Sequence, residues 1–137
     1  MKKVYIAAPF GKIGEPKRHN AESAAIIMEK KGFEVYCPWK NIIPHAWDYP
    51  NIEWGQMVFA NDMVIVLSYG RESTAGTNWE AGYAFGIGKT VVLVEMTDKV
   101  MSLMVANGRW ATLRGLHDLE DYDFEQMIKC RTVTEVK

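Results

Sequence analysis

The sequence predicts an α/β protein in which helices cover both faces of a parallel sheet of four to five strands. Two short runs rich in Val and Ile, residues 63–67 and 90–94, are bounded by turn residues and are typical of buried parallel strands. The segment Asn78–Gly86 between them is apolar enough for a helix and ends in glycine. This βαβ unit predicts a doubly wound, Rossmann- or flavodoxin-like sheet in a single domain of residues 1–137.

The rest of the chain repeats the alternation of strands and helices. Prolines follow the first two predicted strands, and Gly32 ends the amphipathic helix between them. The aromatic-rich segment Trp39–Pro50 predicts a loop over the carboxyl ends of the strands, where such sheets bind ligands. The remaining predicted elements are strands Lys3–Ala8, Phe33–Cys37 and Thr112–Arg114, and helices Arg18–Lys31, Asn51–Asn61, Asp98–Ala106 and Leu119–Lys129.

Composition excludes several classes of function. The chain has 137 residues, 48% of them hydrophobic, which predicts one globular domain with a substantial core. A net charge of −1 without a basic stripe argues against a nucleic-acid polymer as partner. No apolar run has membrane-spanning length, and Met1-Lys2-Lys3 leads straight into a strand, so we expect no membrane partner and a cytoplasmic location. Cys37, Cys130 and three scattered histidines show no metal-ligand spacing, so we expect no metal site.

Four side chains could carry chemistry near the strand ends: Tyr5, Glu53, Asp62 and Glu80. A carboxylate in an apolar pocket, beside a phenol and a second acid, suits attack on an electrophilic carbon. Retaining glycoside cleavage uses two carboxyl groups in this manner, one as nucleophile and one to assist the leaving group. The sequence has no glycine-rich dinucleotide motif, no Walker lysine and no Ser-His-Asp order.

Each candidate also has a purely structural interpretation. Thr77 and Glu80 have the spacing of a capping box, in which the glutamate bonds the backbone N–H at the helix start. Tyr5 could be an ordinary aromatic residue of a strand, and Asp62 a cap at the entry of the strand that follows. These alternatives stay open at the level of the residues alone.

Two motifs resemble those of the nucleoside 2-deoxyribosyltransferase family. Val4–Phe10, Val-Tyr-Ile-Ala-Ala-Pro-Phe, is similar to the family's opening motif. Gly76–Ala84, followed by Gly88-Lys89, is similar to its nucleophile motif. Ser102–Met104 and Asp121–Phe124 match further family signatures, so the resemblance runs from Lys3 to about Phe124.

The resemblance implies roles for individual residues. Glu80 would be the nucleophile that forms a 2-deoxyribosyl–enzyme intermediate, and Tyr5 would orient its carboxylate. Residues in the opening motif, in the nucleophile motif and in the later signatures are expected to contact the substrate. Ser102 and Met104 would complete a neighbouring subunit's site, which implies a homodimer or a multiple of dimers. No metal or organic cofactor is needed. The expected substrate-binding residues are Pro9, Phe10, Asp62, Thr74, Gly76, Ser102 and Met104.

The chain departs from the transferase pattern at the position six residues before Glu80. Transferases carry an Asp there, which holds the sugar 5′-hydroxyl, whereas this chain has Thr74. The related 2′-deoxynucleoside 5′-monophosphate N-hydrolases carry a hydroxyl residue there and a Ser at the position of Ser102. An Asp would repel a phosphate, whereas a hydroxyl and the helix N-terminus at Gly76–Thr77 can donate to one. Alternatively, Thr74 is an ordinary turn residue.

A second departure concerns the acid that assists the leaving base. The family places an Asp eight residues before the position of Asp62, where this chain has Trp54. Glu53 is one residue away, and Asp62 is the other candidate. The sequence thus predicts cleavage of the N-glycosidic bond of a 2′-deoxynucleoside 5′-monophosphate and does not identify the base. Two alternatives remain, a 2-deoxyribosyltransferase acting on nucleosides and a catalytically silent nucleotide-binding module.

Overall fold

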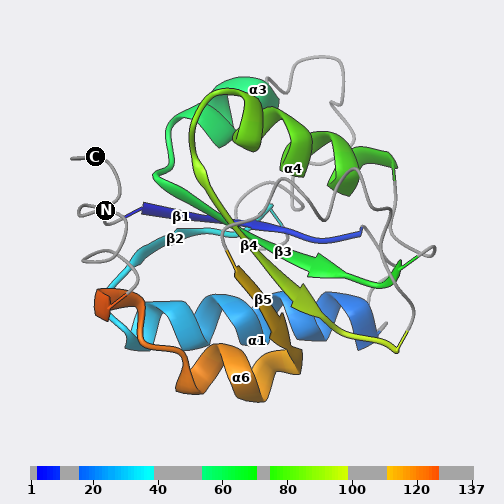
Figure 1. The fold of residues 1–137 in the computed structure, drawn as a ribbon, viewed down its shortest axis with the longest axis vertical. Helices are drawn as coiled ribbons and strands as arrows, with labels where there is room; N and C mark the ends of the chain where they lie inside the picture. The colour runs from blue at the N-terminus through cyan, green and yellow to red at the C-terminus, as the bar shows by residue number, and fades with distance from the viewer. Residues whose placement is uncertain (1–2, 10–15, 39–53, 71–74, 99–110, 127–137) are drawn as a thin grey trace.

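The computed structural model describes residues 3–9, 16–38, 54–70, 75–98 and 111–126 (Figure 1). Five strands form one sheet in the order β2-β1-β3-β4-β5, and all neighbouring strands are parallel. This is the flavodoxin-like strand order, whose connections reverse direction between β1 and β3. The elements are β1 (Lys3–Ala7), α1 (Pro16–Lys30), β2 (Glu34–Tyr36), α3 (Trp54–Phe59), β3 (Met63–Ser68), α4 (Ala75–Gly86), β4 (Thr90–Glu95), β5 (Ala111–Arg114) and α6 (Gly115–Asp121).

Helices cover both faces of the sheet, so its central strands are buried on both sides. In Figure 1, α3 and α4 lie above the sheet, and α1 and α6 lie below it. Side chains alternate between the two faces along each strand. On β1, Val4 and Ile6 join the core on the side of α1 and α6, whereas Tyr5 and Ala7 join the smaller core beneath α3 and α4. Tyr5 therefore faces the helix that carries Glu80.

The predicted α/β fold with a parallel sheet is confirmed, and the strands lie within one or two residues of their expected bounds. The last strand is an edge strand, as expected, because β5 pairs with β4 alone. The predicted helix Asp98–Ala106 and the predicted loop Trp39–Pro50 lie outside the described residues, apart from Asp98. Of the predicted helix Asn51–Asn61, the described part is helical over Trp54–Phe59 and ends before the Asn61 side chain, which bonds the Met57 carbonyl.

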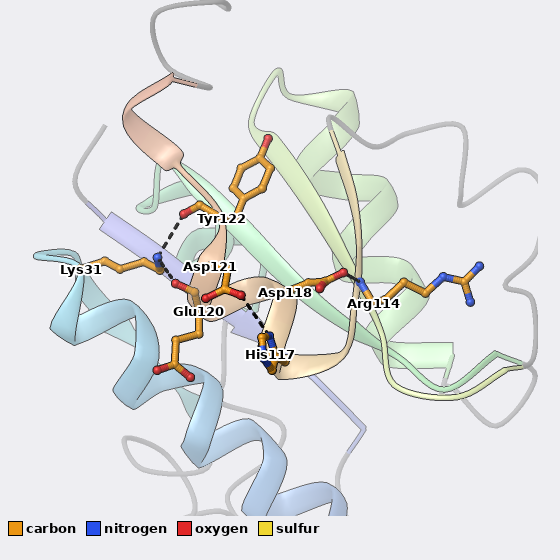
Figure 2. Close-up of polar contacts among 7 residues, drawn as sticks. All are labelled: Lys31, Arg114, His117, Asp118, Glu120, Asp121 and Tyr122. Carbon is orange, nitrogen blue, oxygen red and sulfur yellow. Dashed lines mark hydrogen bonds and ion pairs between the residues drawn. The ribbon is translucent and has the colours of Figure 1, made fainter.

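The prediction of one final helix from Leu119 to Lys129 is wrong in its described part. Helix α6 begins earlier, at Gly115, and ends at Asp121, because Tyr122 adopts an extended conformation with ψ 134°. The Lys31 ammonium, directly after α1, donates to the carbonyls of Glu120 at 2.6 Å and Tyr122 at 3.0 Å (Figure 2). A new helical turn then starts at Phe124, with the Asp123 carboxylate accepting from the Gln126 N–H. One side chain from a distant part of the chain, that of Lys31, thus binds the carbonyls at this helix end.

Candidate active site

Tyr5 and Glu80 form a buried polar pair between the sheet and α4. Tyr5 is the central residue of β1 and is completely buried, and Glu80 lies in the second turn of α4 with 8% of its surface exposed. The Tyr5 hydroxyl donates a hydrogen bond to Glu80 Oε2. Tyr5 belongs to an apolar cluster between the sheet and α4 that includes Val64, Ala84 and Leu93. The structure therefore brings together the two residues that the sequence singled out as nucleophile and orienting group.

Burial controls the electrostatics of this pair. Desolvation raises the pKa of Glu80 to about 7, and the hydrogen bond from Tyr5 acts in the opposite direction by favouring the carboxylate. Burial also raises the pKa of the Tyr5 phenol, and the nearby Glu80 carboxylate raises it further. Tyr5 consequently stays protonated and remains a donor at neutral pH. Glu80 is then a weakly solvated carboxylate that is ionised in a substantial fraction of molecules near pH 7.

The first turn of α4 differs from the predicted one. The helix begins at Ala75 instead of Asn78, so Thr77 lies inside it and cannot serve as its N-cap. The capping-box interpretation of Glu80 is therefore wrong, and the Glu80 carboxylate bonds Tyr5 instead. Gly76 belongs to the first turn of α4, whose backbone N–H groups have no partner within the helix. The helix N-terminus expected near Gly76 is thus present.

Asp62 lies at the amino-terminal edge of the sheet, directly before β3. Its carboxylate accepts a hydrogen bond of 3.0 Å from the backbone N–H of Lys3, the first residue of β1, and its own N–H donates to the Lys3 carbonyl. Helix α4 starts from the opposite, carboxyl-terminal edge. Asp62 is exposed and joins the starts of neighbouring strands, which matches the alternative of a strand-entry cap. This position does not support a substrate contact for Asp62.

The other predicted site residues fall into two groups. Pro9 is buried and lies two residues after the carboxyl end of β1. Five residues lie outside the described part of the chain, namely Phe10, Glu53, Thr74, Ser102 and Met104. Glu53 directly precedes α3, and Thr74 directly precedes α4. Their roles therefore stay predictions.

Sequence reasoning did not single out Tyr36, whose ring stacks on that of Tyr5. The ring centroids are 5.7 Å apart and the planes differ by 13°. Tyr36 lies on β2, directly beside Tyr5 in the register of the sheet, and its hydroxyl donates to Met57 Sδ on α3. One signal was available, since both tyrosines stand shortly before a proline that ends a predicted strand. Without the register between β1 and β2, however, that signal does not show that the rings touch.

Other features of the described residues lie away from this pair. A surface hollow of about 490 Å³ lies between the end of α1 and the segment after α6, lined in part by Lys31, Phe33, Tyr122 and Phe124. Phe33 and Phe124 pack in the core on the other face of the sheet from Glu80. The described side chains form no group of three or more His, Cys, Asp or Glu suited to a metal ion. No helix in the described ranges has the length and apolar character needed to cross a membrane.

The fold and the buried carboxylate–phenol pair define a flavodoxin-like protein with a candidate carboxylate nucleophile. The sequence pattern of the nucleoside 2-deoxyribosyltransferase family matches residues 4–127, and the chain belongs to this family. The expectation of an enzyme that acts on an N-glycosidic bond, by transfer or by cleavage, is thereby confirmed. No curated protein sequence matches the chain.

Solved structures share this fold. The chain is similar to a 2-deoxyribosyltransferase from the psychrotolerant bacterium Bacillus psychrosaccharolyticus, with 26% identity, a TM-score of 0.73, and coverage of 90% of this chain and 94% of the other. A CMP N-glycosidase from Clostridium botulinum aligns with 18% identity and a TM-score of 0.57, covering 82% and 88% of the two chains. A conserved protein from Enterococcus faecalis V583 aligns with 19% identity and a TM-score of 0.67, covering 88% and 96%.

Proposed function

We propose that this protein hydrolyses the N-glycosidic bond of 2′-deoxynucleoside 5′-monophosphates through a covalent intermediate on Glu80. The Glu80 carboxylate attacks C1′, so that a C1′–O bond forms while the bond from C1′ to the base nitrogen breaks. The departing nitrogen keeps the bonding electron pair and receives a proton, for which Glu53 is the proposed donor. Water then gives a proton to the Glu53 carboxylate and attacks C1′. The bond from C1′ to Glu80 breaks, which restores the Glu80 carboxylate and releases 2-deoxyribose 5-phosphate.

The observation that carries this proposal is the hydrogen bond from Tyr5 to Glu80 inside an apolar cluster. A carboxylate whose pKa is about 7 is less stabilised by solvent than an exposed one, which favours its attack on carbon. The neutral phenol holds one oxygen in place and leaves the other able to react. A catalytically silent binding module would have no need for this costly buried pair, so the enzyme interpretation is preferred.

The phosphate preference is proposed from the start of α4. The helix begins at Ala75, one residue after Thr74. The N–H groups of its first turn have no acceptor within the helix, and together with the helix dipole they favour an anion at this point. Thr74 would add a hydroxyl donor, and Ser102 of a neighbouring subunit a second one. A carboxylate in place of Thr74 would instead repel the phosphate. A CMP N-glycosidase shares this fold, so the proposal of a nucleotide substrate is compatible with the fold.

A nucleoside 2-deoxyribosyltransferase is the second candidate. It is favoured by the similarity to the Bacillus psychrosaccharolyticus transferase, which at 26% identity exceeds that to the CMP N-glycosidase. Both reactions share the first half, in which Glu80 takes the deoxyribosyl group. They differ in whether water or a second base accepts this group.

The test compares each deoxynucleoside with its 5′-monophosphate, with and without a second free base. We expect base release from the monophosphates and no transfer. Thr74→Asp should lower monophosphate turnover by at least about tenfold and leave nucleoside turnover unchanged or higher. Ser73→Asp is the matched control, one residue further from α4. A wild-type protein that ignores monophosphates and moves the sugar of nucleosides to a free base would replace the hydrolase with the transferase.

Assembly belongs to the same proposal. We propose that the protein is a homodimer or a multiple of dimers and that it is located in the cytoplasm. In such an assembly, Ser102 and Met104 of one subunit would complete the active site of its neighbour. A mixture of Glu80→Ala and Ser102→Ala subunits, each impaired alone, should then regain activity after exchange, because one site in a mixed dimer is intact. A fully active monomer in light scattering would contradict shared sites.

A further inference from the structure

Tyr36 is the aromatic neighbour of Tyr5 on the adjacent strand. The two residues are partners in the parallel register of β1 and β2, and their rings are stacked with 5.7 Å between centroids. Tyr5 is completely buried, whereas Tyr36 is partly exposed. Tyr36 thus covers one face of the Tyr5 ring at the side of the sheet where β2 is the edge strand.

Tyr36 is itself anchored at its far end. Its hydroxyl donates to Met57 Sδ at 2.8 Å, and Met57 belongs to α3. Both side chains pack against the buried cluster that contains Tyr5. A continuous series of contacts therefore runs from Met57 through Tyr36 and Tyr5 to Glu80, and it joins α3, β2, β1 and α4.

We propose that Tyr36 is a positioning residue, which acts by holding the Tyr5 ring in the plane that directs its hydroxyl onto Glu80. This inference rests on the proposed function of Glu80 as nucleophile. A phenol hydroxyl lies at the end of a rigid ring, so a small rotation of the ring moves it out of hydrogen-bond geometry. The stacked ring restricts that rotation, and the contact with Met57 restricts the stacked ring in turn. Catalytic geometry is sensitive to such displacements.

The pKa of Glu80 reports how well the Tyr5 hydroxyl is held, so it can be used to measure the positioning role of Tyr36. Among the described residues, Tyr5 is the side chain that hydrogen-bonds Glu80, and it favours the ionised carboxylate. Tyr5 in turn is influenced by Glu80 and, less strongly, by Tyr36 and Cys37. If the Tyr5 hydroxyl is held less well, the Glu80 carboxylate loses part of the stabilisation that this hydrogen bond supplies. The Glu80 pKa then rises.

The first experiment follows the Glu80 carboxyl by ¹³C NMR in the ligand-free protein, with Glu80→Gln to assign the signal. Tyr36→Leu should raise the Glu80 pKa toward the value of Tyr5→Phe. Tyr36→Phe keeps the stacked ring but loses its contact with Met57, so its Glu80 pKa should lie between those of the wild type and Tyr36→Leu. Phe33→Leu, a partly buried aromatic on the other face of the sheet, is the control and should change nothing. If Tyr36→Leu does not fold, Tyr36→Met provides the same test.

The second experiment is a double-mutant cycle on kcat with the substrate that the wild type cleaves. Tyr36→Leu should lower kcat about tenfold with little change in KM, and at most twofold when Tyr5→Phe is already present. Equal losses in both backgrounds, or a Glu80 pKa that is unchanged or lower in Tyr36→Leu, would overturn the positioning role. An inactive wild type would refute the proposed function, and the NMR titration would still decide whether Tyr36 positions Tyr5.

Discussion

The Tyr5 hydroxyl donates its hydrogen bond to the Glu80 carboxylate, although the two residues are 75 positions apart in the chain. The contact joins the central residue of β1 to the second turn of α4, across the sheet–helix interface. Because the phenol stays neutral, the Tyr5–Glu80 pair carries at most one charge, and that charge lies on the proposed nucleophile. Two measurable properties of Glu80 follow, one kinetic and one thermodynamic.

The kinetic property is the pH dependence of turnover. Glu80 has its pKa raised to about 7 by burial, and only its ionised form can attack C1′. We therefore expect kcat/KM to rise with pH and to reach half of its plateau near pH 7. Tyr5→Phe should move this midpoint to higher pH, because it removes the hydrogen bond that favours the carboxylate. A wild-type midpoint near 4.5, the ordinary value of a glutamate, would show that Glu80 is not desolvated in the working enzyme.

The thermodynamic property is the free energy of unfolding, which the burial of Glu80 lowers as the pH rises. The Glu80 pKa is higher in the folded protein than the ordinary 4.5, so its contribution to stability is present below about pH 4.5 and is lost as the pH rises through 7. Glu80→Gln removes this loss and should be more stable than the wild type at pH 8, by up to about 3 kcal/mol, and nearly equal at pH 4. Urea unfolding at both pH values measures the difference. Glu34→Gln, the same exchange at an exposed position of β2, is the control for the substitution itself.

Lys31 is expected to stabilise the end of α6 against α1. Its ammonium donates to two carbonyls, those of Glu120 and Tyr122 (Figure 2). It also lies 5.7 Å from the centre of the Phe124 ring. Lys31→Met keeps the length of the side chain but removes these donors, and should lower the free energy of unfolding by about 1–2 kcal/mol. The exposed neighbour Lys30 is the control, and Lys30→Met should change it by less than about 0.5 kcal/mol. Equal effects of the two substitutions in thermal unfolding would refute the role of Lys31.

Thr90 carries a buried hydroxyl that has no hydrogen-bond partner among the described residues. Thr90→Val keeps the shape of the side chain at the start of β4 and removes this unpaired polar atom. It should raise the free energy of unfolding by about 1 kcal/mol. A loss of stability in Thr90→Val would mean that its hydroxyl is satisfied in solution.

The strands were predictable from the sequence because their signals are local. The apolar runs form β3 and β4 themselves, and Pro9 and Pro38 each lie two residues beyond the end of β1 and β2. The ends of α4 and α6 were not predictable in the same way. Helix α4 starts before the apparent cap Thr77, and α6 ends where Lys31, from a distant part of the chain, bonds its last carbonyls. Such tertiary contacts leave no periodic pattern in the sequence.

The residues of the candidate site also differ in whether a local sequence signal or a tertiary contact identifies them. Glu80 and Tyr5 could be predicted because each lies in a motif that resembles the family pattern. Asp62 was a plausible site residue by composition, but its backbone partner Lys3 holds it at the other edge of the sheet. Tyr36 escaped prediction because its importance depends on the register between two strands.

The covalent intermediate tests the central claim most directly. The wild-type protein is mixed with a 2′-deoxynucleoside 5′-monophosphate, quenched in acid within the first turnover, and analysed by intact-protein and peptide mass spectrometry. We predict a mass increase equal to one deoxyribose 5-phosphate less water, located on the peptide that contains Glu80. The same peptide from Glu80→Gln should carry no such mass, and base release should fall by several orders of magnitude. An adduct on another residue, or Glu80→Gln turnover near that of the wild type, would contradict the account.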